Sequence, residues 1–354
     1  MKFINVKNLF LEITYKITMK KLISLLVLLI FFNFSYSQNR VGDTGFISFT
    51  IEEENDQIDF VIADTVLNTQ KPLLLFCQGS TPMPLFMDVG NNRIVPMPLG
   101  NFDLEEMRKH YHVAVISMPK TPMIVEYGEL SEQYFYIGNS GSKNPTEEFS
   151  LADYIENYVR RANVVIDYLK TKDFIDFTKL VVCGHSQGSR VAVGIADANE
   201  DVTHLGLFAY SYERRIDGII RKIRAQAEKG EITWEEADAK QSSQYEFYKR
   251  VLNDDSLKIR PHLTSWRSFS KSTIEELASL EIPVYIANGS EDISCANTDM
   301  IPLYFIEQGK TNYFIKRYSG LEHNFFPIVD GKPDHKNGEW KNVMNAFIEW
   351  SLDN

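Results

Sequence analysis

Cysteine is scarce in this chain: Cys77, Cys183 and Cys295 are the only three among 354 residues. An odd count leaves at least one thiol unpaired, and Cys77 and Cys183 lie in apolar runs typical of core strands, so we expect no disulfide. A small fold held together by disulfide bonds is therefore excluded. Stability must come from a hydrophobic core, for which an apolar content of 44% is sufficient.

Basic residues are also few. The chain has 37 lysines and arginines against 48 aspartates and glutamates, a net charge of -11. Without residues 1–37, 32 basic and 47 acidic residues remain, and the net charge is -15. Such a surface repels nucleic acid, so we predict no nucleic-acid partner. The sequence also lacks an internal repeat and a phosphate-binding loop, and the pair His110 and His112 has no carboxylate or cysteine to complete a metal site.

Long apolar runs are absent except near the N-terminus. Lys20 and Lys21 precede about a dozen apolar residues, and small residues follow at 35 and 37. The pattern predicts a secretory signal peptide over residues 1–37, cut after Ser37, with Met19 as an alternative start. The run is shorter than the roughly 20 residues that span a bilayer, although an uncleaved anchor is the alternative. We therefore expect export to the periplasm or the exterior, with membrane contact only through the signal sequence.

The most informative segment covers residues 180–188, where an apolar strand runs into Gly-His-Ser-Gln-Gly. This is the pattern of a nucleophile elbow, a tight strand-to-helix turn that exposes its serine, Ser186. Gly184 and Gly188 are small because bulk at either position would collide with the neighbouring strand or helix. The helix that follows would direct its N-terminal amides towards developing negative charge.

Strand patterns fill the rest of the chain. Residues 46–51 and 58–63 alternate polar and apolar side chains, which predicts an antiparallel hairpin at a sheet edge. Later strands are continuous apolar runs separated by helical patterns, which predicts an α/β fold with a parallel sheet covered on both faces. One helix is expected to begin at Ser150 with a capping pair at Asp153, and the last to cover residues 340–352.

Two polar loops after later strands supply an acid and a base. Asp292 follows the strand at 283–288, and His323 follows the strand at 312–318, so serine, acid and histidine occur in this order. The chain here resembles the α/β-hydrolase family, over roughly residues 45–352. The resemblance implies an eight-stranded, mostly parallel sheet and a triad of Ser186, His323 and Asp292 that needs no metal or organic cofactor. Glu291 is the alternative acid.

The resemblance also implies an oxyanion hole. One donor would be the main-chain N–H of Gln187, directly after the nucleophile. The other would follow the strand at 72–77, from Ser80 or from Gly79. Many relatives carry a His-Gly pair here, so Gln78 departs from the family pattern. This departure affects the side-chain contacts that the loop can make and does not affect the main-chain N–H that it would donate.

Three segments do not fit the repeat of strands and helices. Residues 212–272, inserted after the sixth strand, are rich in charge and hold a capping box at Thr233 and Glu236. We expect a helical cap over the active site, or alternatively an external decoration, between core segments 38–211 and 273–354. Residues 81–98 and 121–148 are expected to be long loops. Candidate substrate contacts in these segments are Phe86, Met87, Tyr134 and Glu213.

These observations favour an exported serine hydrolase that cleaves a small carboxylic ester through an acyl-enzyme. A peptidase of the prolyl-oligopeptidase or aminopeptidase type, acting on a short peptide, is the main alternative, and Glu213 would favour it if it bound a substrate amine. Glu213, Arg214 and Arg215 alternatively form a solvated helix start. A non-catalytic binding module is a further alternative.

Overall fold

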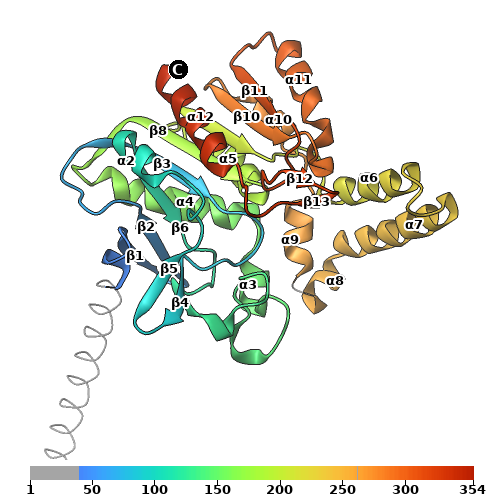
Figure 1. The fold of residues 1–354 in the computed structure, drawn as a ribbon, viewed down its shortest axis with the longest axis horizontal. Coiled ribbons are helices and arrows are strands. Elements are labelled where there is room, and N and C mark those ends of the chain that lie inside the picture. Colours follow the sequence, from blue (N-terminus) through green and yellow to red (C-terminus); the bar gives the residue numbers. More distant parts are fainter. Residues whose placement is uncertain (1–39, 261) are drawn as a thin grey trace, which may run out of the picture.

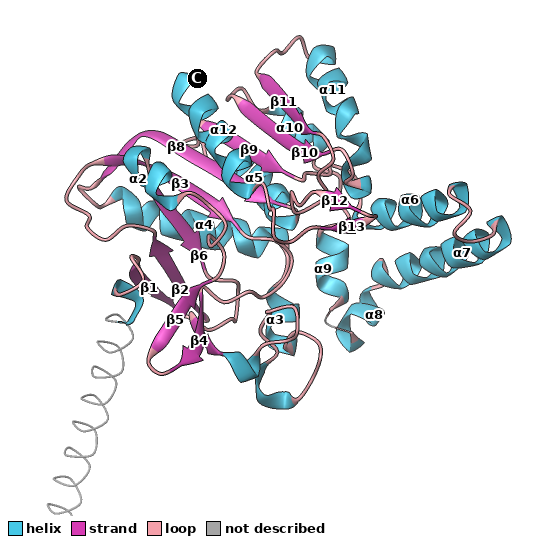
Figure 2. Ribbon diagram, viewed as in Figure 1, coloured by secondary structure: helices cyan, strands magenta, loops and turns pink. Residues whose placement is uncertain are grey.

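The computed structural model describes residues 40–260 and 262–354, so the predicted signal peptide lies outside the described residues. Its centre is a sheet of eight strands, with helices on both faces (Figures 1 and 2). In spatial order the strands are β1 (Ile47–Glu53), β2 (Asp56–Ile62), β6 (His112–Ile116), β3 (Lys71–Cys77), β8 (Ile175–His185), β9 (His204–Phe208), β10 (Val284–Gly289) and β11 (Tyr313–Tyr318).

The pairing confirms the predicted α/β architecture. β1 and β2 form an antiparallel hairpin at one edge, β2 is antiparallel to β6, and every later pair is parallel. The interior strands β9 and β10 are buried along their whole length, which explains why they read as continuous apolar runs. Because parallel strands end at the same edge, the loops after β3, β8, β10 and β11 meet there.

Helices form a layer on each face. On one side lie α4 (Ile155–Lys170), α5 (Gln187–Ala198), α10 (Ile274–Ser279) and α11 (Ile301–Glu307), whose apolar side chains share one core cluster. On the other side, α2 (Leu104–His110) and α12 (Trp340–Asp353) share the second cluster. The last helix thus begins at the residue predicted from the sequence. The two clusters hold the sheet between them and fix the positions of its loops.

The predicted helix start at Ser150 is wrong. Ser150 lies inside the short helix α3 (Glu147–Ala152), whose N-terminal cap is Thr146, and α4 begins only at Ile155. Asp153 stands between the two helices and accepts hydrogen bonds from Tyr158 Oη and Gln187 Nε2, both at 2.8 Å. Its carboxylate therefore fixes the start of α5 instead of capping a helix.

The two segments expected to be loops also differ from the prediction. β4 (Phe86–Gly90), β5 (Arg93–Pro96) and β7 (Ile124–Glu126) pair into a small second sheet. The turn between β4 and β5 is Asn91-Asn92, both with positive φ, a pair typical of a two-residue hairpin turn. The remaining short elements are η1 (Tyr127–Glu129), η2 (Gly138–Ser140), η3 (Ile293–Met300), β12 (Ile328–Val329) and β13 (Lys332–Pro333).

Between β9 and β10 the chain forms an all-helical insertion, with helices α6 (Arg215–Glu228), α7 (Trp234–Val251), α8 (Asp254–Ile259) and α9 (Leu263–Ser268). α6 and α7 project from the body at the right of Figure 1. The capping box of α7 is present, with the Thr233 and Glu236 side chains each accepting the other's main-chain N–H. In the described part of the chain, no helix has the length and apolar character needed to cross a membrane.

Candidate active site

Ser186 occupies the turn between β8 and α5 with φ +56° and ψ -120°, a backbone conformation that L-residues rarely adopt. The turn is possible because two glycines flank it. A Cβ at Gly184 would lie 2.2 Å from the carbonyl oxygen of Gly188, and a Cβ at Gly188 would lie 2.2 Å from that of Cys77. The Ser186 N–H donates to Phe208 O at 2.9 Å, which ties the turn to β9.

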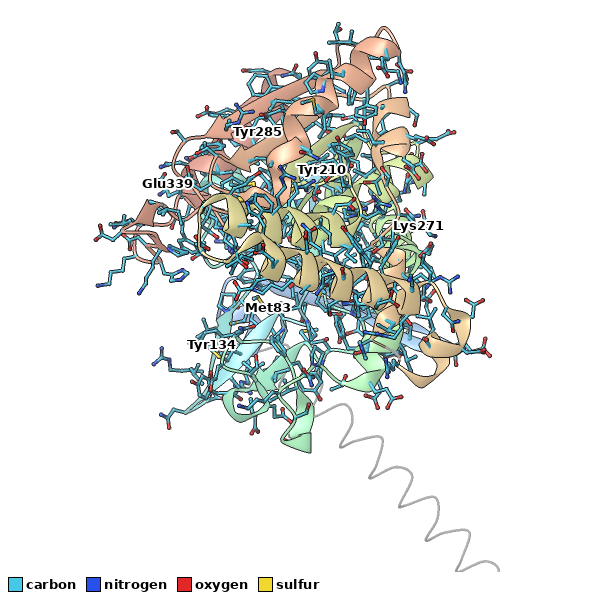
Figure 3. All side chains as sticks on the ribbon, turned by 90° about the vertical axis from the view of Figure 1, so that its right-hand side faces the viewer. Met83, Tyr134, Tyr210, Lys271, Tyr285 and Glu339 are labelled. Carbon is cyan, nitrogen blue, oxygen red and sulfur yellow. The ribbon has the colours of Figure 1, made fainter. Side chains whose placement is uncertain are left out.

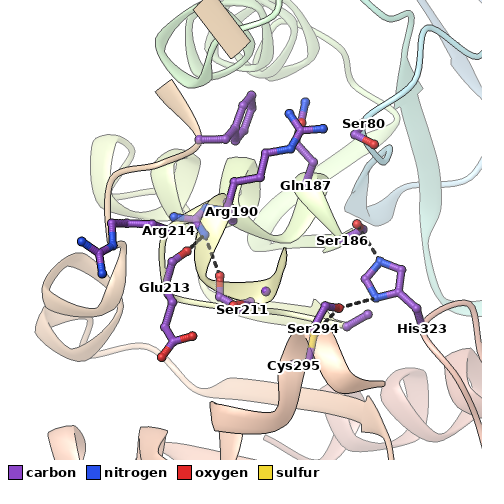
Figure 4. A pocket seen from close by; sticks show the side chains of 14 residues that line it. Ser80, Ser186, Gln187, Arg190, Ser211, Glu213, Arg214, Ser294, Cys295 and His323 are labelled. Carbon is purple, nitrogen blue, oxygen red and sulfur yellow. Dashed lines mark hydrogen bonds between the residues drawn. The ribbon is translucent and has the colours of Figure 1, made fainter. Parts of the chain in front are cut away.

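The three predicted triad residues form one chain of hydrogen bonds. His323, in the loop after β11, lies with Nε2 2.8 Å from Ser186 Oγ and with Nδ1 2.6 Å from Asp292 Oδ2. Asp292 follows β10 and is the N-cap of η3. Figure 4 shows the contact between Ser186 and His323. This geometry lets the imidazole take the Ser186 proton while the carboxylate fixes its tautomer.

The structure favours Asp292 over Glu291 as the acid. Asp292 is buried, and its Oδ1 accepts hydrogen bonds from the main-chain N–H (3.0 Å) and the hydroxyl of Ser294. Burial alone would raise the pKa of Asp292, but the hydrogen bond and charge of His323, with help from Ser294, lower it to about 2. Asp292 therefore stays ionised at neutral pH. Glu291 is exposed and accepts from Ser290 Oγ at 3.2 Å.

The two histidines of the site differ in charge preference. Burial disfavours the charged form of His323, yet the bonded Asp292 carboxylate outweighs burial and raises the pKa of His323. Burial, and next the neighbouring His323, lowers the pKa of His185 to about 3, so His185 remains neutral. The His185 ring packs against Trp340 with centroids 5.0 Å apart, and its Nε2 lies 3.0 Å from His323 O. It supports the loop that carries His323.

The main-chain N–H groups predicted for the oxyanion hole, those of Gln187 and of Ser80 or Gly79, lie on the two loops that border the cavities at Ser186. Gln187 is the first residue of α5, so its N–H has no intrahelical acceptor, and its buried side chain is held by Asp153. Gln187 N, Ser80 N and Gly79 N all lack an acceptor among the residues described. Figure 4 draws Ser80 beside Ser186, whereas Gly79 packs against His185. The Gln78 side chain donates to Ile116 O at 2.8 Å and so anchors this loop to β6.

Two cavities open at Ser186 and His323. One, of about 210 Å³, extends under the insertion and is lined there by Glu213, Arg214 and Arg215. The other, of about 360 Å³, also borders Ser80 and has a mixed lining of polar residues, aromatic rings and methionines. Its apolar lining residues are Phe76, Met83, Met97, Pro98, Phe102 and Trp340. A substrate bound at Ser186 can therefore place one group in each cavity.

Of the predicted substrate contacts, only Glu213 reaches these cavities. Phe86 is buried because the pleat of β4 turns it inward, where its ring meets Phe46 with centroids 5.6 Å apart. Met87 points the other way within the small sheet and is half-buried. Tyr134 is 45% exposed at a turn with φ +63° and lies at the edge of the molecule in Figure 3.

Sequence reasoning missed two residues of the site, Ser294 and Arg190. Ser294, two residues beyond Asp292, bonds that carboxylate and lies 3.2 Å from His323 Nδ1. Arg190 lies on α5, buried, and donates to the carbonyl oxygens of Ser211, Glu213 and Lys271. Arg215 was expected either to face the pocket or to lie at a solvated helix start, and it lines the cavity. A charged side chain in the apolar run after the elbow was the signal for Arg190.

One group of potential metal ligands occurs among the described residues, comprising Asp292, Cys295 and His323. Its atoms fit a metal poorly. Nδ1 of His323 and Oδ2 of Asp292 already bond each other, and burial raises the pKa of the Cys295 thiol well above its usual value, which keeps it protonated.

No protein-family model matches the sequence, and no curated protein sequence matches it either. Solved structures do match its fold. The acylaminoacyl peptidase of Pyrococcus horikoshii superposes with a TM-score of 0.51 at 13% identity, over 85% of this chain and 41% of that protein. A Klebsiella pneumoniae structure described as a dienelactone hydrolase gives 0.50 at 10% identity, over 87% and 99%.

The chain thus spans about two fifths of the length of the Pyrococcus peptidase and nearly all of the Klebsiella protein. At such low identity the likeness concerns the fold. Strand order, strand directions and the elbow between β8 and α5 agree with it. The chain therefore has the α/β-hydrolase fold.

Proposed function

We propose that the protein is an exported serine hydrolase that cleaves a carboxylic ester through an acyl-enzyme. The observation that carries the proposal is the chain of hydrogen bonds from Ser186 through His323 to the buried Asp292 carboxylate. Ser186 alone would be unreactive at neutral pH, and a neutral imidazole at 2.8 Å supplies the base it needs.

In the first half-reaction, Ser186 Oγ attacks the ester carbonyl carbon while His323 Nε2 takes its proton. The oxyanion binds the N–H groups of Gln187 and Ser80, and the positive end of the α5 dipole adds to this stabilisation. The C–O bond of the ester then breaks, and His323 returns the proton to the leaving alcohol. In the second half-reaction water replaces the alcohol, and the acyl group leaves Ser186 as a carboxylic acid.

The position of Glu213 supports an ester over an aminopeptidase substrate. An aminopeptidase needs a carboxylate that is open to a substrate amine. Glu213 instead pairs with Arg221 and accepts from Asn297 Nδ2, so its charge is already neutralised within the protein. Export rests on the N-terminal sequence, where two lysines precede the apolar run.

The test is pre-steady-state hydrolysis of 4-nitrophenyl butyrate by the purified mature protein. We expect a burst of nitrophenol close to one equivalent, followed by slower turnover, and no burst with S186A. Acetyl-amino acid and aminoacyl 4-nitroanilides run in parallel. Faster turnover of an anilide than of the ester would move the proposal to a peptidase, and undiminished ester turnover by S186A would overturn it.

A further inference from the structure

The smaller cavity beside Ser186 is positively charged. Arg190, Arg214 and Arg215 all line it, and Glu213 is its one acidic lining residue outside the triad. The Glu213 carboxylate is paired with Arg221. The surplus of positive charge stands out in a chain of net charge -11, because the average surface is acidic. The positive charge of this cavity therefore has to be explained from the residues that line it.

The three arginines differ in what else they bind. Arg190 is buried and its terminal nitrogens donate to the main-chain carbonyls of Ser211, Glu213 and Lys271, so it joins α5 to the insertion and adds positive charge to the cavity. Arg214 is paired with Asp217 at 3.1 Å. Arg215 has no ion-pair partner among the described carboxylates, and it reaches Ser265 Oγ with Nη1 at 3.0 Å.

Arg215 is nevertheless held in place. Its guanidinium lies 4.6 Å from the ring centroid of Trp266, a cation–π contact that fixes the plane of the group. Burial lowers the pKa of Arg215, and the charge of Asp153 acts against that effect. Asp153 is occupied by Tyr158 and Gln187, however, and does not pair with the guanidinium. The arrangement presents a fixed, weakly hydrated cation to the cavity.

The helix dipole disfavours this placement, and the carboxylate of Asp217 in the first turn pairs with Arg214 but not with Arg215. Arg215 is the first residue of α6 and Arg214 its N-cap, and the positive end of the dipole repels a cation at a helix N-terminus. The same terminus favours an anion, because its free N–H groups and dipole are positive. An anionic ligand would pair with Arg215 and would also interact favourably with the positive end of the α6 dipole.

We infer that this cavity binds a carboxylate on the substrate through Arg215, so that the enzyme prefers esters or amides with an anionic group on one side of the scissile carbonyl. The inference rests on the proposed function. The second cavity at Ser186, of about 360 Å³ and without a lysine, arginine, aspartate or glutamate in its lining, takes the neutral part of the molecule. Guanidinium and carboxylate match as a planar, bidentate pair, which gives Arg215 the geometry for specificity.

The test measures kcat/KM for two pairs of esters that differ in charge. In the first pair, 4-acetoxybenzoate and its methyl ester, the charge is on the leaving group. In the second, mono-4-nitrophenyl adipate and 4-nitrophenyl heptanoate, it is on the acyl group. We expect the anionic member to be preferred in one pair, and R215Q to lower that preference about tenfold, the effect of losing one hydrogen bond to a charged group. R215K should keep part of it.

R224Q is the matched control, because Arg224 lies on the same helix, is exposed and pairs with Glu228 outside the cavity. It should leave the preference unchanged. A wild-type enzyme with no anionic preference in either pair would overturn the inference, as would an equal preference in R215Q. Labelling of wild-type Ser186 by a neutral fluorophosphonate keeps the two questions apart. If labelling succeeds and the preference is absent, only this inference fails, whereas absent labelling refutes the proposed function as well.

Discussion

The strained backbone at Ser186 predicts that glycine at this position is more stabilising than alanine. Its φ of +56° and ψ of -120° mirror the extended region, which glycine occupies readily and other residues do not. Holding a non-glycine residue in such a conformation costs about 1–3 kcal/mol. S186A and S186G both remove the hydroxyl and its contact with His323 Nε2, so the comparison between them isolates the backbone.

The magnitude follows from two opposing terms. S186G relieves the strain of about 1–3 kcal/mol, and the greater freedom of glycine in the unfolded chain costs about 0.5–1 kcal/mol. We therefore expect S186G to be more stable than S186A by about 1 kcal/mol. For a domain of this size that difference corresponds to a melting temperature higher by roughly 1–2 °C.

The assay is equilibrium urea unfolding of both variants, followed by tryptophan fluorescence and far-ultraviolet circular dichroism. Equal m-values would show that both variants expose the same surface area on unfolding, so that their urea midpoints can be compared as measures of stability. If S186G proves less stable than S186A by the ordinary glycine penalty, the backbone at this turn is unstrained and the reasoning is refuted.

Three further predictions concern the same loops. D292N should lower kcat by a factor of about 10³–10⁴, because it removes the carboxylate charge and the hydrogen bond that holds His323 in the correct tautomer. E291Q should stay near wild type, and a large loss in E291Q alone would assign the role of the acid to Glu291. The value of kcat/KM should rise with pH as His323 loses its proton, with an apparent pKa above 6.5, because the Asp292 carboxylate raises the pKa of His323. If the rise does not move to lower pH in D292N, this prediction is wrong. G188A should abolish soluble expression or cooperative unfolding, because its Cβ would lie 2.2 and 2.3 Å from the main-chain oxygens of Cys77 and Gln78. A folded G188A would show that the loop after β3 can move away from this position.

The sheet and the three central residues of the site could be predicted from the sequence because local rules and tertiary structure agree there. Buried parallel strands need continuous apolar runs, and the turn at Ser186 needs glycines at 184 and 188, so both features can be recognised directly in the amino-acid sequence. The order of serine, acid and histidine then follows from the strands that carry them.

The cavity walls could not be predicted in the same way. Phe86 and Met87 have the side chains of a pocket, but β4 pairs with β5 and β7 and turns Phe86 into the core. Only the paired asparagines at 91 and 92 hinted at that hairpin. Glu213 does line the cavity, yet its role depends on Arg221, eight residues away across the start of α6. Such pairings are decided by tertiary contacts.

Helix starts also depended on tertiary contacts. The sequence from Ser150 to Asp153 has the spacing of a capping pair, but Thr146 already caps α3 and Asp153 bonds Gln187 on α5 instead. A short polar side chain satisfies either a local or a distant donor, and the distant one lies next to Ser186. The capping box at Thr233 was predictable because nothing else competes for it on the projecting helix α7.

Intact-mass analysis after treatment with a fluorophosphonate tests most directly whether His323 and Asp292 activate Ser186. The account predicts one adduct per chain on the wild-type protein, mapped to the peptide that contains Ser186, none on S186A, and much slower labelling of D292N. A folded wild-type protein that forms no adduct, or one that labels equally in S186A, would contradict it.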